Sequence, residues 1–341
     1  MIRKTALLLT LGLLLPAASE TEIRFPSDAD GITLEGTLLH PGAGPAPVVI
    51  MVSGSGPQDR DETIGGRKPF RVIAEDLVKR GVASFRFDDR GIGGSGGTQD
   101  TTLEEVDADL SGALRAVCGR AEVDPTQIGF LGHSAGAINV ARLLGRNAGA
   151  AFGVMLAGPA VHGEALLREQ IRLRLQLLGK TEAEQMRNDE TVGALIAAAR
   201  RGPDLLKATA EGLALQDNAD PDWSARQIEF FGSKMSRSFV ESDPATDLSK
   251  VTAPMLALYG MSDWQVEPHI NTKAAREAMI NSPEAKVLML EWHDHLLQFV
   301  PNMDPMVALG PAPSPQAMEI LGDWIEDRKP STRSACEGLP E

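Results

Sequence analysis

One serine in the middle of the chain has the neighbours expected of a nucleophile. The segment Gly132-His133-Ser134-Ala135-Gly136 fits the pattern G-x-S-x-G, in which a serine is held on a sharp turn between a strand and a helix. Glycines on both sides of such a serine leave room for the turning backbone. The pattern predicts that Ser134 attacks a carbonyl carbon, although a glycine-rich turn without any chemistry has the same composition.

Two of the six histidines lie where a base for this serine is expected. A serine hydroxyl is a weak nucleophile and needs a base to take its proton. His293 and His295 follow the last predicted strand. Three of the others begin or end predicted elements, and His133 adjoins the serine on a turn that is expected to point its side chain away from the site. We choose His295 because residues 296–299 after it are mostly apolar and can fix the loop, and His293 is the alternative.

The acid that orients this base is expected to leave a strand between the serine and the histidine. Asp263 does so, because the apolar run at 255–259 continues through Gly260 to this carboxylate. Glu267 and Asp294 are weaker alternatives. An aspartate in such a position can also simply cap a loop or a helix.

Two backbone amides are expected to bind the oxyanion of the reaction. One is the amide after the nucleophile, which belongs to Ala135, and the other should come from the glycine-rich segment 53–56 that follows an early buried strand. Ser55 is the preferred second donor and Gly56 the next. No metal or cofactor is expected, because the carboxylates and histidines lack the spacing of metal ligands.

The elements that must position these residues alternate between β-rich runs and helical patterns. This alternation predicts an α/β fold with a mostly parallel sheet flanked by helices. Strands are expected at residues 22–26, 32–40, 47–52, 82–87, 127–131, 152–156, 255–259 and 286–290, the first two as a hairpin. Helices are expected at 70–80, after 102, at 136–144, near 269–280 and at 315–327.

The domain organisation follows from a change of composition after the strand at 152–156. Residues 20–160 and 250–328 are expected to form two parts of one α/β core. Residues 161–249 are rich in Leu, Ala, Arg, Gln and Glu and have no strand pattern, so they are expected to form a helical insertion. The polar tail at 329–341 is expected to be loose.

The N-terminal residues 1–19 are expected to be a secretory signal peptide. Basic residues precede an apolar run at 6–15, and small residues lie before a cleavage point after Ser19. The run is short for a membrane span, so the mature chain should begin near Glu20 and work in the periplasm or outside the cell, without stable membrane insertion. An uncleaved anchor is the alternative.

Composition and charge narrow the expected partners. The 341 residues include 43% hydrophobic ones, enough for a substantial core, and the net charge of −14 argues against nucleic acid and anionic membranes as partners. A small-molecule substrate fits this balance, and the oligomeric state is left open. An exported chain with only Cys118 and Cys336 can pair them or keep Cys118 as a buried thiol, and the sequence leaves both possibilities open.

Gly91, Gly93 and Gly96 also satisfy G-x-G-x-x-G, the dinucleotide fingerprint. That fingerprint requires glycines that open a helix directly, so that the pyrophosphate meets the helix N-terminus. The next helix is expected only after a capping box of Thr102 and Glu105. Nucleotide binding is therefore disfavoured.

Five motifs between residues 53 and 298 carry a family resemblance. They are Ser53-Gly54-Ser55-Gly56-Pro57-Gln58-Asp59-Arg60-Asp61, Asp88-Asp89-Arg90-Gly91 with Gly93 and Ser95, the serine motif at 132–136, Gly260 with Asp263, and Asp294-His295-Leu296-Leu297-Gln298. With these motifs the chain resembles the α/β-hydrolase superfamily, and within it the EstD-like bacterial serine esterases, also described as serine aminopeptidase-like or dienelactone-hydrolase-related.

The resemblance implies an α/β-hydrolase fold in which the helical insertion is a cap over the active site. It favours His295, because two apolar residues and a glutamine follow the family's histidine. The chain departs from the family at Ala135 and Ala137, where Glu and a second Gly are frequent, but both residues are small and Ala135 keeps its amide.

The expected function is hydrolysis of small or short-acyl carboxylic esters by a Ser-His-Asp mechanism with an acyl-enzyme. An exported peptidase or amidase with the same triad is the alternative, although the sequence reveals no site for a peptide terminus. A non-catalytic binding protein on this fold is disfavoured, because every member of the triad has a candidate.

Overall fold

The structure is a computed structural model, and it describes residues 17–42, 44–146, 149–216, 219–220, 222–301, 310–337 and 339. Most of the predicted signal peptide, residues 1–16, lies outside the described residues. Ser19, after which cleavage is expected, is the first residue of strand β1. None of the helices in the described part of the chain is long and apolar enough to cross a membrane.

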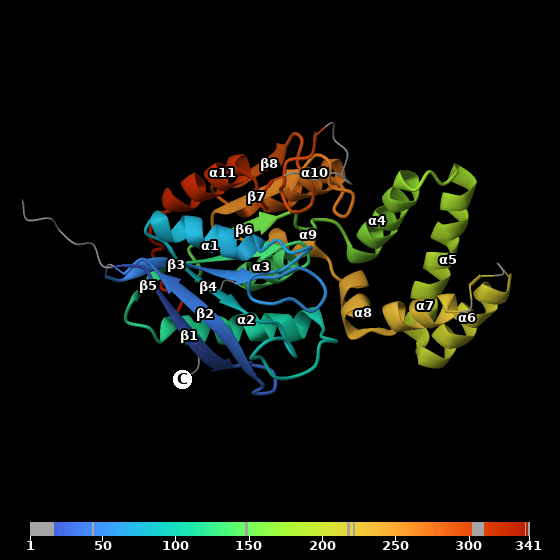
Figure 1. The fold of residues 1–341 in the computed structure, drawn as a ribbon, viewed down its shortest axis with the longest axis horizontal. Helices are drawn as coiled ribbons and strands as arrows, with labels where there is room; N and C mark the ends of the chain where they lie inside the picture. The colour runs from blue at the N-terminus through green and yellow to red at the C-terminus, as the bar shows by residue number, and fades with distance from the viewer. Residues whose placement is uncertain are drawn as a thin grey trace, which may run out of the picture.

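The strands of the described residues form one sheet in the order β1-β2-β4-β3-β5-β6-β7-β8 (Figure 1). Their bounds are β1 Ser19–Pro26, β2 Thr33–His40, β3 Ala46–Val52, β4 Ala83–Phe87, β5 Val123–His133, β6 Phe152–Leu156, β7 Met255–Gly260 and β8 Lys286–Leu290. β1 and β2 form the predicted antiparallel hairpin, and β2 also runs antiparallel to β4. All other neighbours are parallel, which confirms the prediction of a mostly parallel sheet.

Helices cover both faces of this sheet. α1 (Pro69–Lys79) and α11 (Pro315–Glu326) pack on one face. α2 (Leu103–Cys118), α3 (Gly136–Gly145) and α10 (Pro268–Ala278) pack on the other, and the short helix η1 (Met279–Asn281) follows α10. Because both faces are covered, β4, β6 and β7 are buried at every position, as expected for parallel strands in an α/β protein.

A run of helices connects β6 to β7. These helices are α4 (Gly163–Leu177), α5 (Glu182–Arg201), α6 (Pro203–Gln216), α7 (Trp223–Gly232), α8 (Lys234–Val240) and α9 (Pro244–Leu248). They have an apolar cluster of their own around Leu195, Leu206 and Phe231, and α4 to α7 stand to the right of the sheet in Figure 1. Whether residues 161–249 act as a separate cap stays a prediction.

The glycine-rich loop at 91–97 connects β4 to α2 and does not open the helix. Gly91 donates its amide to the carbonyl of Gly96, so the loop closes on itself. α2 begins later, where the Thr102 hydroxyl accepts from the Glu105 amide at 3.0 Å and the Glu105 carboxylate accepts from the Thr102 amide at 2.7 Å. The predicted capping box is therefore confirmed.

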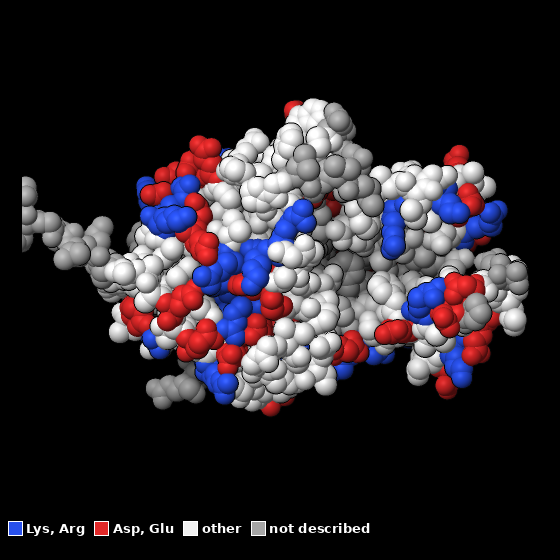
Figure 2. All heavy atoms as spheres, viewed as in Figure 1, with Lys and Arg blue, Asp and Glu red and all other residues white. Residues whose placement is uncertain are grey.

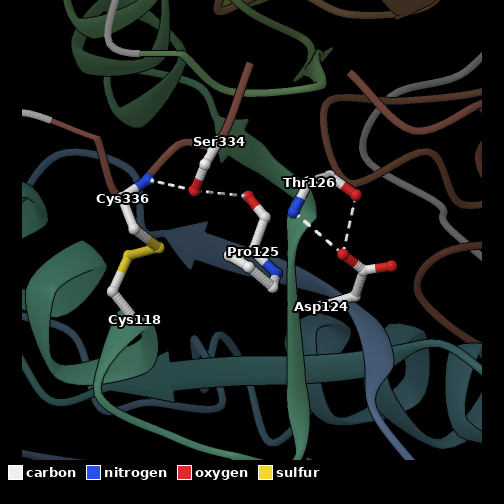
Figure 3. The surroundings of a disulfide bond; sticks show 6 residues. All are labelled: Cys118, Asp124, Pro125, Thr126, Ser334 and Cys336. Atoms are coloured by element: carbon white, nitrogen blue, oxygen red, sulfur yellow. Dashed lines mark hydrogen bonds between the residues drawn. A yellow bond between two sulfur atoms is a disulfide. The ribbon is translucent and has the colours of Figure 1, made fainter. Parts of the chain in front are cut away.

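A disulfide joins Cys118, at the end of α2, to Cys336 in the C-terminal tail (Figure 3). The tail also pairs with the start of β5, because the amides of Ser331 and Ala335 donate to the carbonyls of Thr126 and Pro125. The expectation of a loose tail is wrong for its described residues, since the two cysteines pair and hold it against the core.

Candidate active site

Ser134 lies at the carboxyl end of β5 with a φ of 49°, in the left-handed region that residues with a side chain rarely adopt. The flanking glycines make this turn possible. A Cβ on Gly132 would lie 2.4 Å from the Gly136 carbonyl oxygen, and a Cβ on Gly136 would lie 2.4 Å from the carbonyl oxygen of Ser53. The spatial reason predicted for both glycines is therefore confirmed.

Asp263 follows β7 and His295 follows β8, at the same edge of the sheet as Ser134, because β5 to β8 run parallel. The Asp263 Oδ2 atom lies 2.7 Å from Nδ1 of His295, and both side chains are buried. The other carboxylate oxygen, Oδ1, accepts from the amides of Gln265 at 2.7 Å and Val266 at 3.0 Å. The carboxylate is thus held on one side by its own loop and presented to the histidine on the other.

Gly260 allows the loops that carry the acid and the histidine to meet. A Cβ at this position would lie 2.4 Å from the carbonyl oxygen of His293. Next to it, the amide of Ser262 donates to that same carbonyl at 2.8 Å. The two loops are therefore joined backbone to backbone beside the contact between Asp263 and His295.

His293, the alternative base, is engaged elsewhere. Its Nδ1 lies 2.7 Å from the Glu291 carbonyl and its Nε2 lies 2.7 Å from the Ser314 hydroxyl, which also caps α11. Among the described residues its ring makes no hydrogen bond with a candidate acid. His293 therefore ties the loop after β8 to the start of α11.

The alternative acids also have local partners. Glu267 caps α10 through the amide of Ile270, and Asp294 accepts from the amides of Leu296 and Gln298, both at 2.9 Å. Burial raises the pKa of Asp294, against the effect of these two hydrogen bonds. Each carboxylate stabilises its own turn.

The apolar segment after His295 packs only in part. Leu297 is buried among the residues under α1 and α11, whereas Phe299 is 46% exposed. The expectation that the segment packs therefore holds for Leu297, whereas Phe299 is only partly covered and holds the loop through an antiparallel bridge to His293. Phe299 makes an edge contact with His293, with ring centres 6.5 Å apart, and nearly half of its surface faces outward.

The two predicted oxyanion donors are the amides of Ala135 and Ser55. Ala135 is buried at the N-terminus of α3, and Ser55 is exposed in the loop after β3. This loop packs closely against the nucleophile segment, as shown by Gly54, where an added Cβ would lie 3.2 Å from the Ser134 Cβ. Within the described chain neither amide donates a hydrogen bond to the protein. In the same residues no group of His, Cys, Asp and Glu side chains is arranged to hold a metal ion.

Two aspartates at the end of β4 hold this loop, and the sequence signalled them only as a family motif. Asp89 accepts from the Ser53 hydroxyl at 2.8 Å and from the Gln58 amide at 2.9 Å, so it clamps both ends of the loop. Asp88 pairs with Arg60 at 2.7 Å. Burial raises the pKa of Asp89 to about 7, although its hydrogen bonds act in the opposite direction.

A second carboxylate and imidazole lie beside the contact between Asp263 and His295, and no sequence pattern indicated that they meet. Glu62 Oε1 lies 2.8 Å from Nδ1 of His133, and the same oxygen accepts from the Gly54 amide at 2.8 Å. The expectation that His133 points elsewhere is wrong, because its ring centre lies 4.8 Å from that of His295. Burial lowers the pKa of His133, but the charge of Glu62 and its hydrogen bond more than offset this, and the net shift is upward.

Residues 68–298 match the family described as serine aminopeptidase, S33. The chain belongs to this family. One relative of this chain is the esterase EstD of Thermotoga maritima, which is 29% identical over 301 residues. That alignment covers 84% of this chain and 66% of EstD, so the chain spans slightly less than two-thirds of that relative's length.

Solved structures that are similar to this chain have the α/β-hydrolase fold. The esterase Pf2001 of Pyrococcus furiosus superposes with a TM-score of 0.58 and 15% identity, over 91% of each chain. The α/β hydrolase GrgF of a Penicillium species gives 0.54 and 18% identity, over 82% of this chain and 91% of its own. An acetyl xylan esterase of a Paenibacillus species gives 0.56 and 15% identity, over 96% of this chain and 88% of its own. The fold and the family predicted from the motifs are confirmed.

Proposed function

We propose that this protein is a serine hydrolase that cleaves carboxylic ester bonds of small substrates. The observation that carries the proposal is the 2.7 Å contact between Asp263 and His295, at the sheet edge where Ser134 is held in a strained turn. A buried carboxylate on Nδ1 leaves Nε2 of the imidazole as the base. No other pair of a histidine and an acid among the candidates has this arrangement.

In the proposed reaction, Nε2 of His295 takes the proton of Ser134 as the hydroxyl oxygen attacks the ester carbonyl carbon. The oxyanion that forms accepts hydrogen bonds from the amides of Ala135 and Ser55. The imidazolium, stabilised by Asp263, then gives its proton to the departing alcohol. Water activated by His295 hydrolyses the acyl-enzyme and releases the acid and the free serine.

We propose esters rather than amides as substrates because of the names of the relatives. EstD and the Pyrococcus and Paenibacillus proteins carry the name esterase, whereas the family is described by an aminopeptidase. That description makes an amidase or peptidase the second candidate. An amine is a poorer leaving group than an alcohol, so amide cleavage depends more strongly on proton transfer from His295.

Two further points belong to the proposal. The insertion formed by α4 to α9 acts as a cap that sets substrate choice, and the protein is exported after removal of residues 1–19. The disulfide between Cys118 and Cys336 supports export, because such bonds persist mainly in oxidising compartments. Figure 2 supports a small substrate over a nucleic acid, since basic and acidic side chains are interspersed on the face it shows.

The purified protein should be tested with p-nitrophenyl esters of increasing acyl length and with aminoacyl p-nitroanilides. Turnover of short esters above that of anilides, absent from Ser134→Ala, is the expected result. Anilide turnover without ester turnover would favour the peptidase, and no turnover of either class would contradict both. N-terminal sequencing of the exported protein tests cleavage after Ser19.

A further inference from the structure

Glu62 and His133 form a buried pair that the triad mechanism leaves without a role. Glu62 is 1% exposed and His133 is 5% exposed. The Glu62 backbone has a φ of 53°, in the left-handed region, so the chain turns unfavourably to direct this side chain inward. Such backbone strain at a buried charged group suggests a function for the contact.

The contacts of His133 favour a doubly protonated ring. His133 Nε2 lies 3.1 Å from the carbonyl oxygen of His295, which can only accept, so Nε2 carries a proton. Nδ1 faces Glu62 Oε1, which already accepts from Gly54. The second oxygen, Oε2, is buried and has no partner among the described residues, so a hydroxyl there would lack an acceptor. Both ring nitrogens of His133 thus face oxygen acceptors, and the charge of Glu62 raises the pKa of His133, so the contacts favour the imidazolium.

These contacts connect three segments of the proposed site. Glu62 holds the amide of Gly54, directly before the proposed oxyanion donor Ser55. His133 is covalently bonded to Ser134, and through Nε2 it holds the main chain of His295. Three other titratable groups face the pair. The charge of Asp263 also favours protonation of His133, the charge of Glu62 helps to raise the pKa of Asp89, and the ring centre of His295 lies 4.8 Å from that of His133.

We propose that Glu62 and His133 are positioning residues, which keep the oxyanion loop, the nucleophile and the catalytic histidine in register. The proposal rests on the function proposed above. A doubly protonated ring is required, because a neutral ring has one N–H and cannot donate to both Glu62 and His295. Removing the charge of Glu62 should therefore release the His295 main chain even if the hydrogen bond to Gly54 survives.

Glu62→Gln tests this, because glutamine keeps the size of the side chain and its oxygen can still accept from the Gly54 amide. We expect kcat for p-nitrophenyl acetate to fall by about 10- to 100-fold, with KM within about twofold, since only the reacting groups are displaced. Asp107→Asn is the matched control. Asp107 is 3% exposed and binds Arg142 and Arg146, away from the candidate site residues.

The comparison is made at equal folded fraction, measured by thermal unfolding. Glu62→Gln with kcat within twofold of wild type would overturn the proposal, as would an equal loss of kcat in Asp107→Asn. Both results presuppose turnover by the wild-type enzyme. Absence of that turnover would instead contradict the proposed function, so the two failures can be distinguished.

A measurement on the unaltered protein keeps the test decisive if Glu62→Gln does not fold. Protein labelled with 15N in its histidine rings should show a doubly protonated imidazole at about pH 7, above the ordinary imidazole pKa of about 6.5, because the charge of Glu62 and the His295 carbonyl stabilise that form. If every histidine is neutral at this pH, the pair does not hold the charge that the three contacts require, and the proposal is wrong.

Discussion

Asp263→Asn should disable the proposed base by reversing the tautomer of His295. In the wild-type site, Oδ1 of Asp263 accepts from two loop amides, those of Gln265 and Val266. An asparagine keeps those two hydrogen bonds only if its oxygen takes the place of Oδ1, so its NH2 group faces Nδ1 of His295. Nδ1 must then accept, which moves the ring proton to Nε2, where a free lone pair is needed to deprotonate Ser134.

The size of the effect follows from this geometry. The variant loses both the correct tautomer and the carboxylate that stabilises the imidazolium, and an equivalent change in another serine hydrolase lowers kcat by about 10⁴. A loss of that size corresponds to about 5 kcal/mol of transition-state stabilisation. KM should change little, because Asp263 is buried behind the histidine and is not expected to contact substrate.

Initial rates with p-nitrophenyl acetate, together with thermal unfolding, provide the assay. Glu267→Gln is the matched control, because Glu267 lies four residues along the chain and caps α10 without touching His295. It should keep kcat within about twofold, as expected for a partly exposed cap. A kcat loss in Asp263→Asn of less than about tenfold in folded protein would refute the tautomer argument.

His293→Asn should lower thermal stability and leave kcat within about tenfold of wild type. His295→Asn should abolish turnover, because the His295 ring contacts the proposed acid Asp263. The reverse result in steady-state kinetics would exchange the roles of the two histidines. Replacing Cys118 and Cys336 by Ser frees the tail, and since 218 residues separate them, loop closure gives an upper limit of about 5 kcal/mol. We expect urea unfolding to report a loss of about 2–4 kcal/mol, and a loss below about 1 kcal/mol would mean that the tail is held by its hydrogen bonds. The pKa of Asp89 is about 7 in the folded chain and about 4 when unfolded, so its stabilising contribution is full below about pH 4 and is lost as the pH rises through 7. The melting temperature of the wild type relative to Asp89→Asn should therefore fall between about pH 4 and pH 7, and a constant difference would contradict the raised pKa.

Much of the fold could be predicted because local sequence patterns determine where its strands and helices lie. Short apolar runs such as 152–156 become fully buried strands, and the capping box at Thr102 marks the start of α2. The chain order of a parallel sheet then brings Ser134, Asp263 and His295 to one edge. The order of the helices in the insertion gave no comparable signal, since α4 to α8 pack mainly on one another.

The features that sequence reasoning missed depend on contacts between distant segments. Glu62 and His133 are 71 residues apart, and the inward turn of Glu62 depends on a loop that Asp88 and Asp89 hold from another strand. The cysteines are 218 residues apart, so only the pairing of the tail with β5 brings their sulfurs together. Local spacing carries no information about such contacts.

The central claim is that Ser134 is the nucleophile, and mass spectrometry after reaction with a fluorophosphonate ester tests it most directly. Such reagents form a stable phosphonyl adduct with a serine that a neighbouring base has activated. We expect one adduct per chain, on the peptide that contains Ser134, with esterase activity lost in proportion and no labelling of Ser134→Ala. An adduct on another serine, or turnover that persists in Ser134→Ala, would contradict the account.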